Sequence, residues 1–278
     1  MSPFELAEPG SLAEAIGLLG EQGARPLSGG TALMLMMKAG VFRPSRLVSL
    51  RKLRLESIEA GAGGELHIGA MTTLGALERS AVVKWAFPVI ARTLRTLANV
   101  RVRNVATVGG ALAHADPHMD LPPLLSALGA SVTIAGPGGE RSVAVEALYA
   151  GYLENTLKPG ELITRLEVPA LGRRRAAYLK CTTRSADDWP ALGMAVVLDG
   201  VEARIVIGAA TDRPTRLSSS EEILRGRLSD ETAIRRAGEA GAEEVQIESD
   251  LHGSAAYKKQ LIRVYLARAI HEARDAVH

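Results

Sequence analysis

The chain has 278 residues, of which 47% are hydrophobic, 23% charged and 4% aromatic, with a formal net charge of +2. This composition predicts a globular protein of one large domain or two ordinary ones, with a mainly aliphatic core. The small charge and the scattered arginines argue against a nucleic-acid-binding protein. Cys181 is the only cysteine, which excludes an intramolecular disulfide, and an iron–sulfur cluster or zinc site built on cysteines of this chain.

The N-terminal stretch "MSPFELAEPGSLAEAIGLLG" lacks the basic and apolar pattern of a signal peptide. No apolar run reaches the roughly 18 residues that a membrane span needs. We therefore expect a cytoplasmic protein with no membrane span.

The first part of the chain alternates helical and extended patterns. Ser11 is a typical N-cap for the helical spacing that follows it, and glycines end both predicted helices. The elements predicted for residues 1–55, in chain order, are a helix at 11–23, a short strand that runs into a glycine turn at 24–30, a helix at 31–40 and a strand at 46–50.

The middle of the chain, residues 56–172, is also mixed. A Gly-Pro-Gly-Gly sequence between two β-branched stretches predicts a hairpin, and two prolines near the first turn favour a helix start. The predicted elements are a strand at 66–69 leading into a helix, a helix at 86–99, a short strand with a glycine turn at 103–115, a helix at 121–130, a hairpin at 131–145 and a strand at 160–169.

A basic, loop-like stretch at 171–180 separates this part from the rest, and we place a domain boundary there, between 1–172 and 173–278. Beyond it, Asp199-Gly200 predicts a turn between two antiparallel strands. Helical patterns follow at 230–244 and 254–278. The fold class is therefore α+β: two small subdomains, about 1–55 and 56–172, and then a domain of sheet and helices.

Two glycine pairs share one pattern, in "LSGGTAL" (27–33) and "ATVGGAL" (106–112), where a hydroxyl residue precedes the pair. Glycine lets backbone N–H groups approach a ligand closely, and consecutive N–H groups can bind an anion such as a diphosphate. Either pair alone is more often an ordinary tight turn. Neither matches the P-loop or the G-x-G-x-x-G motif, so a dinucleotide would be bound in another fold.

The stretch "HADPHMD" (114–120) that follows the second pair raises the question of a metal site. Its spacing does not match known His and Cys metal motifs, and Pro117 interrupts any regular strand, so we predict no metal. Asp116-Pro117 is typical of a turn before the next helix. The residues assign no role to His118.

The segment "RNVATVGGALAHADPHMDLPPLLSALGASV" resembles the second FAD-binding motif of the flavin subunit of molybdenum hydroxylases, the family of xanthine dehydrogenase and carbon monoxide dehydrogenase. "RPLSGGTALMLMMKAGVFRPSRLVSL" resembles their first motif. "HIGAMTTLGALERS", "LKPGELITRLEVP", "YLKCTTRSADDWPALGMAV" and "DLHGSAAYKKQLIRV" are also similar to family sequence. The resemblance covers nearly the whole chain in the family's order.

The resemblance implies a fold of the vanillyl-alcohol-oxidase type. Two α+β subdomains would hold FAD, and a C-terminal domain with a three-stranded antiparallel sheet and helices would cover it. It also implies a large partner with molybdenum-pterin and a small partner with two [2Fe–2S] clusters, in a dimer of heterotrimers. The flavin would pass electrons from the clusters to NAD, a quinone or oxygen. The substrate, the acceptor and the oligomeric state stay open, and no residue of this chain is expected to be catalytic.

The resemblance also carries FAD contacts onto individual positions. The first motif would bind the pyrophosphate, the second would clasp it from the other side, Asp120 would reach a hydroxyl of the ribose or adenine side, and Lys180 would approach the isoalloxazine ring. Without the resemblance, Lys180 would be a solvated surface lysine. The cofactor-binding residues are Ser28, Gly29, Gly30, Thr31, Ala32, Leu33, Thr107, Gly109, Gly110, Ala111, His114, Asp120, Leu162, Ile163 and Lys180.

The chain departs from the family pattern in its first motif, where Ser28 replaces the usual Ala and Thr31-Ala32 replaces a polar-Ser pair. Thr31 retains a hydroxyl, so we expect binding to survive. The single cysteine, Cys181, disfavours the benzoyl-CoA-reductase-type branch, whose flavin subunit carries an extra cluster; its own role stays open. Two alternatives remain: a flavin-free scaffold subunit and a stand-alone flavin oxidase.

Overall fold

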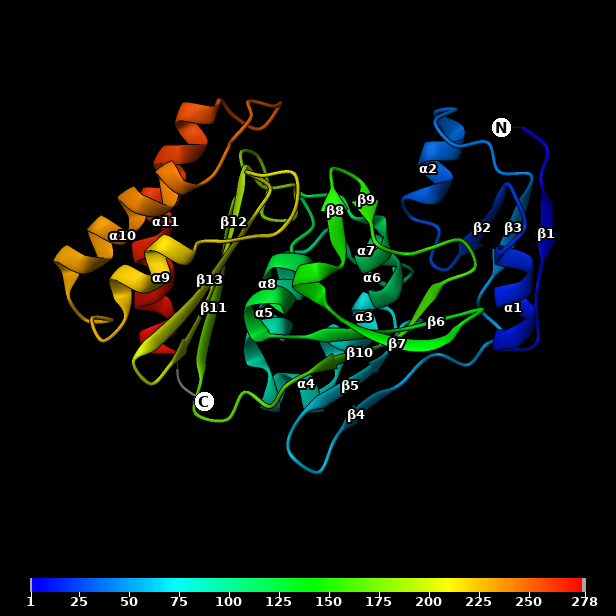
Figure 1. Ribbon diagram of the computed structural model, residues 1–278, viewed down its shortest axis with the longest axis horizontal. Helices are drawn as coiled ribbons and strands as arrows, with labels where there is room; N and C mark the ends of the chain where they lie inside the picture. The colour runs from blue at the N-terminus through cyan, green and yellow to red at the C-terminus, as the bar shows by residue number, and fades with distance from the viewer. Residues whose placement is uncertain (1, 277–278) are drawn as a thin grey trace.

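The computed structural model describes residues 2–276. Its N-terminal unit, blue in Figure 1, is a three-stranded parallel sheet with order β1-β3-β2 and two helices. The Ser11 hydroxyl accepts the Glu14 N–H and caps the first helix, as the sequence predicted. Segment 28–32 leaves the carboxyl end of β2, the edge of a parallel sheet where ligands commonly bind. The elements are β1 (Glu5–Ala7), α1 (Leu12–Leu19), β2 (Ala24–Leu27), α2 (Leu33–Lys38) and β3 (Arg46–Ser49).

The second unit is a five-stranded antiparallel sheet with order β4-β5-β10-β6-β7. The last of these five strands in chain order, β10, is central in the sheet: its Arg165 lies opposite Gly69 of β5 on one side and Thr133 of β6 on the other. The predicted hairpin and the strand at 160–169 are thereby confirmed. The strands are β4 (Ile58–Ala60), β5 (Leu66–Gly69), β6 (Ser131–Gly136), β7 (Gly139–Ala144) and β10 (Leu162–Val168).

Six helices accompany this sheet and supply much of the core, and two of them, α4 and α7, contact its strands directly. Every residue of α8 is buried, which explains its apolar sequence, and Gly129 ends it in the left-handed region with φ of +78°. The helices are α3 (Leu74–Arg79), α4 (Ala81–Ala86), α5 (Pro88–Thr96), α6 (Val100–Arg103), α7 (Val108–His114) and α8 (Leu121–Leu128). A 3-10 turn η1 (Val145–Ala147) and a small pair, β8 (Tyr149–Gly151) and β9 (Glu154–Asn155), complete the unit.

The prediction of a short strand and glycine turn at 103–115 was wrong. The structure places α7 there, and both glycines lie in its first turn. The Thr107 hydroxyl accepts the Gly110 N–H and caps the helix. The cap outweighs the low helix propensity of Gly109 and Gly110.

The C-terminal sheet has four antiparallel strands, order β11-β12-β13-β14, rather than the expected three. The extra strand is only two polar residues long, too short to show an alternating pattern. The basic stretch expected to be a loop is instead largely β11, whose inner residues Ala176 and Ala177 are buried. The strands are β11 (Arg175–Cys181), β12 (Leu192–Asp199), β13 (Glu202–Gly208) and β14 (Thr215–Arg216).

Two helices, α9 (Ser218–Leu224) and α11 (Ala255–Asp275), cover the outer face of this sheet, and α10 (Glu231–Glu244) packs on both of them. The predicted C-terminal helix was longer, and its last two residues, 277–278, lie outside the described part of the chain. The inner face of the sheet packs on α8, so that Val197 and Val206 join the core of the second unit. Between residues 2 and 276, no helix has the length and apolar composition needed to cross a membrane.

Candidate functional site

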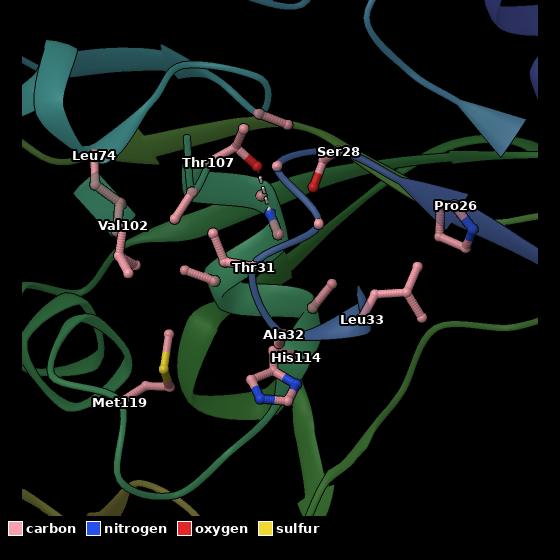
Figure 2. Close-up of a pocket in the computed structure, with 18 of the residues that line it drawn as sticks. Pro26, Ser28, Thr31, Ala32, Leu33, Leu74, Val102, Thr107, His114 and Met119 are labelled. Carbon is pink, nitrogen blue, oxygen red and sulfur yellow. Dashed lines mark hydrogen bonds between the residues drawn. The ribbon is translucent and has the colours of Figure 1, made fainter. Parts of the chain in front are cut away.

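A cavity of about 440 Å³ lies where the N-terminal unit meets the second unit. Figure 2 shows the segment with Ser28, Thr31 and Ala32 running alongside α7, with Leu74, Val102 and Met119 around the same space. Of the fifteen predicted FAD contacts, fourteen line this one cavity: Ser28, Gly29, Gly30, Thr31, Ala32, Leu33, Thr107, Gly109, Gly110, Ala111, His114, Asp120, Leu162 and Ile163. The two glycine pairs, far apart in sequence, therefore meet at one site.

The first glycine segment, residues 28–33, presents free donors. Across residues 2–276, the backbone N–H groups from Gly29 to Leu33 find no acceptor in the protein. No side chain caps α2 at Ala32, and Gly30 has φ of +69°, a conformation that favours glycine. The segment is half-buried, so these donors are accessible from the cavity. This arrangement suits a phosphate ligand.

The second glycine segment, residues 107–111, differs from our expectation of a second set of free N–H groups. Gly109 donates to the Ala70 carbonyl oxygen at 2.8 Å, and Ala111 donates to that of Thr107 at 2.9 Å. Gly110 donates to the Thr107 hydroxyl at 3.1 Å. Its donors are used to fix α7 against β5, so this segment contributes shape rather than hydrogen-bond donors.

Glycine is required at two of these positions by close packing with protein. A Cβ on Gly29 would overlap the Val105 carbonyl oxygen and lie 2.9 Å from the Cα of Ala106. A Cβ on Gly109 would lie 2.6 Å from the Cβ of Ala70. Both glycines thus let the two segments and β5 approach one another, and their missing side chains do not face the cavity.

Gly110 differs from its neighbour. The two atoms nearest to a Cβ there would be hydroxyl oxygens, Ser28 Oγ at 2.6 Å and Thr107 Oγ1 at 2.9 Å. Because Ser28 belongs to the first segment, the space beside Gly110 is the gap between the two segments. A larger residue at 110 would fill that gap.

Two titratable residues among the predicted contacts, His114 and Asp120, line the cavity. Burial lowers the pKa of His114, which ends α7. Asp120 is almost fully buried; one oxygen accepts the Tyr178 hydroxyl at 2.7 Å and the other accepts Lys180 Nζ at 3.1 Å. Burial raises the pKa of the Asp120 carboxyl, against the opposing effects of Lys180 and Tyr178. Tyr178 and Lys180 therefore fix the position of the Asp120 carboxylate.

Lys180 is the one predicted contact that does not line the cavity. It is not a solvated surface lysine either, because its side chain is 7% exposed. Its Nζ donates to the carbonyl oxygens of Thr96 at 2.6 Å and Asp188 at 3.1 Å and to the Asp120 carboxylate, which uses its three N–H donors. Lys180 can therefore act on the cavity through Asp120.

The cavity wall is mostly apolar, with Leu162 and Ile163 at the start of β10. Several wall residues were not predicted: Met36, Leu74, Leu97, Val102, Met119, Asp187, Asp188 and Trp189. The apolar ones carry no signal in a single sequence, because a cavity wall and a core have the same composition. Asp187, Asp188 and Trp189 occur in one of the family-like stretches, and the sequence alone assigned them no contact with a cofactor.

The turn expected at Asp116-Pro117 is confirmed: the Asp116 side chain accepts the His118 N–H at 2.9 Å. His118, left without a role by the sequence, is buried at the cavity edge. Cys181 is buried, and its Sγ lies 3.8 Å from the Tyr257 hydroxyl. In the part of the chain that the structure describes, no three His, Cys, Asp or Glu side chains form a metal site.

Comparison with known proteins covers nearly the whole chain. Residues 2–171 match the family model described as the FAD binding domain in molybdopterin dehydrogenase, and residues 177–273 match the CO dehydrogenase flavoprotein C-terminal domain. The glyceraldehyde dehydrogenase medium chain of Sulfolobus acidocaldarius is 29% identical, over 97% of this chain and 98% of its own length. The carbon monoxide dehydrogenase medium chain of Afipia carboxidovorans is 32% identical, over 98% and 96%.

Solved structures of related subunits share the fold of the whole chain. Reconstituted CO dehydrogenase from Oligotropha carboxidovorans superposes with a TM-score of 0.94 at 32% identity, covering 99% of each chain. Quinoline 2-oxidoreductase from Pseudomonas putida 86 gives a TM-score of 0.92 at 31% identity, covering 99% and 98%. The chain therefore belongs to the family of FAD-binding medium subunits of molybdopterin dehydrogenases, the oxidoreductase subunits of the carbon monoxide dehydrogenase and xanthine dehydrogenase type.

Proposed function

We propose that the chain holds FAD in the cavity between the two glycine segments, with the pyrophosphate at residues 29–33. The observation that carries this proposal is the run of N–H groups from Gly29 to Leu33, which lie beside the cavity and have no acceptor among the described residues 2–276. The apolar wall suits the ring systems of a dinucleotide, and the hydroxyls of Ser28 and Thr31 add polar contacts. FAD, when bound, supplies the capacity to accept and release electrons.

The protein's own residues would bind and orient the cofactor. The second glycine segment, Gly109 to Ala111, would form a wall of the cofactor site without donating hydrogen bonds. Leu162 and Ile163 would pack on the rings of the cofactor. Asp120, fixed by Lys180 and Tyr178, would accept a cofactor hydroxyl with a remaining lone pair. Lys180 would act on the cofactor through Asp120 rather than by contact.

We infer that the chain relays electrons. They would come from the two [2Fe–2S] clusters of a small partner subunit and leave to an external acceptor, while a large partner with molybdenum-pterin oxidises the substrate. The relatives named above as medium chains support such an assembly, and a dimer of heterotrimers is part of the proposal. We also propose the vanillyl-alcohol-oxidase fold type and a boundary between residues 172 and 173.

The experiment is to denature the purified complex and record the absorbance spectrum and amount of released flavin. We expect one FAD per chain. A flavin-free complex would favour the scaffold alternative. To test the relay, substrate is added anaerobically to the complex and, as the matched control, to this chain alone with FAD. Flavin bleaching only in the complex supports the relay, whereas bleaching of the lone chain would favour a stand-alone oxidase.

A further inference from the structure

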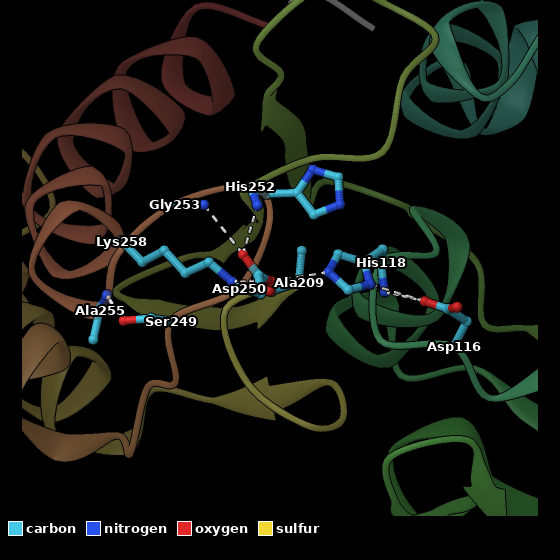
Figure 3. A network of polar contacts seen from close by, with 9 residues as sticks. All are labelled: Asp116, His118, Ala209, Ser249, Asp250, His252, Gly253, Ala255 and Lys258. Carbon is cyan, nitrogen blue, oxygen red and sulfur yellow. Dashed lines mark hydrogen bonds and ion pairs between the residues drawn. The ribbon is translucent and has the colours of Figure 1, made fainter.

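A chain of alternating charges joins the edge of the cavity to the C-terminal domain. We call Asp116, His118, Asp250 and Lys258 the His118 cluster (Figure 3). The first two residues lie between α7 and α8, and the last two lie in the loop before α11 and in its first turns. Asp250 is 132 residues from His118 in sequence, so the cluster exists only in the folded chain.

Both ring nitrogens of His118 face carboxylate oxygens. Nδ1 lies 3.0 Å from Asp116 Oδ1, and Nε2 lies 3.2 Å from Asp250 Oδ2. A neutral imidazole has one N–H, so one carboxylate would face a nitrogen lone pair. Only the imidazolium donates to both. The geometry therefore selects the protonated form of His118.

Lys258 completes the charge balance. It is 1% exposed, and its Nζ donates to Asp250 Oδ2 at 2.6 Å and to the Ala209 carbonyl oxygen at 3.0 Å. With His118 protonated, the cluster holds two carboxylates and two cations. Loss of the His118 proton leaves a net negative charge in a mainly buried site, which is unfavourable.

The other groups near His118 are not expected to take up its proton. The Trp189 ring is stacked on it, with centroids 5.4 Å apart and planes at 7°, and His252 lies 4.9 Å away. His114 Nε2 lies 4.0 Å from Asp116. Burial lowers the pKa of both His252 and His114. Burial also lowers the pKa of His118, but its two carboxylate partners outweigh this and raise it overall.

The cluster holds the segment that carries part of the cavity wall. Met119 and Asp120 directly follow His118 and line the cavity, and Trp189, stacked on His118, lines it too. The Ala209 N–H donates to the Pro117 carbonyl oxygen at 2.8 Å, a further tie to the C-terminal domain. Ordering this segment before binding would raise affinity, because less flexibility is lost on binding.

We propose that His118 is a positioning residue: as an imidazolium it pins segment 116–120 to the C-terminal domain, and FAD affinity falls when it loses its proton. The proposal rests on the FAD site proposed above. It makes cofactor retention depend on pH above the usual histidine pKa, through a residue outside both glycine segments.

The test measures FAD affinity of the full-length chain between pH 6 and 8.5 by flavin fluorescence, in wild type, His118→Gln and His271→Gln. His271 is the matched control, because it pairs with Glu231 at 3.0 Å on an exposed surface outside the cavity lining. We expect wild type and His271→Gln to lose about five- to tenfold in affinity across this range, as for a pKa change of up to one unit on binding. His118→Gln should bind more weakly at pH 6 and show little pH dependence.

Imidazole NMR of the wild type gives a readout that requires no variant to fold. The His118 signal should titrate above the usual histidine pKa, and higher with FAD than without it. A His118 pKa unaffected by FAD, or a wild-type pH profile in His118→Gln, would overturn the proposal alone. Wild type that binds no FAD at any pH would instead overturn the FAD site, and the proposal with it.

Discussion

The two glycine pairs of this chain look alike in sequence but differ in what their backbones do. Residues 29–33 carry N–H groups without an acceptor across the described residues 2–276, whereas Gly109, Gly110 and Ala111 already donate within the protein. The first pair lies in a half-buried segment after a parallel strand. The second lies in the first turn of α7, where Gly109 is buried and Gly110 is half-buried. A repeated motif can therefore contain one binding segment and one supporting segment.

Packing against the second glycine segment and the residues before it positions the first glycine segment. Gly29 packs against the Val105 and Ala106 backbone just before α7, and Gly109 packs against Ala70 at the end of β5. These contacts bring the end of β2 to the side of α7. The free donors of the first segment owe their position to glycines whose role is packing.

The largest expected effect comes from adding a methyl group at these packing positions. Gly29→Ala and Gly109→Ala should each lower the free energy of unfolding by about 2–4 kcal/mol, because the new Cβ meets protein backbone or a buried alanine. Denaturant unfolding measures this loss. Gly138→Ala, where a Cβ would meet nothing within 4 Å, is the control and should change little. Wild-type stability in both packing variants would contradict the assignment.

The second effect separates binding from folding. Gly110→Val should abolish FAD binding, because its side chain enters the gap between Ser28 and Thr107. Stability should fall by only about 1 kcal/mol, the typical value of a disturbed helix cap. Bound FAD per chain and the unfolding midpoint are measured on the same preparation. Full flavin content in a folded Gly110→Val protein would show that the cofactor does not pass between the segments.

Smaller effects are expected from removing the hydroxyl of Thr31 or of Thr107, one in each glycine segment. Thr31→Val should weaken FAD binding by about five- to tenfold, the value of one hydrogen bond, without altering stability. Thr107→Val should instead cost about 1 kcal/mol of stability, because the Thr107 hydroxyl caps α7. Titration calorimetry and thermal unfolding of both variants give the comparison. If the two effects were exchanged, the assignment of binding and supporting segments would be reversed.

The smallest effect is on the pH dependence of stability in the FAD-free chain. The pKa of Asp250 is lowered to about 2 by Lys258, the His252 backbone and His118, against the effect of burial, so its contribution is present above the usual value of 3.8 and is lost as the pH falls toward 2. The pKa of His118 is raised above 6.5, so its contribution is full below 6.5 and is lost as the pH rises through the raised value.

The His118 cluster should therefore stabilise the chain most between about pH 4 and 6.5. Unfolding midpoints measured across pH 4 to 9 should decline on the alkaline side in wild type and decline less in His118→Gln. His271→Gln serves again as the control. An identical alkaline decline in all three proteins would mean that His118 does not carry the charge in the folded state.

The sequence predicted much of the site because its signals are local. The glycine pairs after hydroxyl residues, together with the resemblance to the family, predicted that Ser28–Leu33 and Thr107–Ala111 lie at one site. The hairpin at 131–145 and the strand pair around Asp199-Gly200 followed from turn residues and β-branched runs in the same way.

What the sequence did not predict depends on partners distant in the chain. The two glycines of α7 suggested a turn, because the Thr107 cap and the Ala70 contact that stabilise the helix are invisible in composition. The "RRRAAYLK" stretch suggested a loop, because strand β11 is defined by its neighbour β12. His118 had no evident role, since Asp250 and Lys258 lie more than 130 residues away.

Hydrogen exchange of backbone amides, with and without FAD, tests the difference between the two segments most directly. It reports on the N–H groups themselves. In the FAD-free chain, amides 29–33 should exchange fast and amides 109–111 slowly; FAD should protect the first set strongly and leave the second nearly unchanged. Equal protection of both sets by FAD, or none in residues 29–33, would contradict the account.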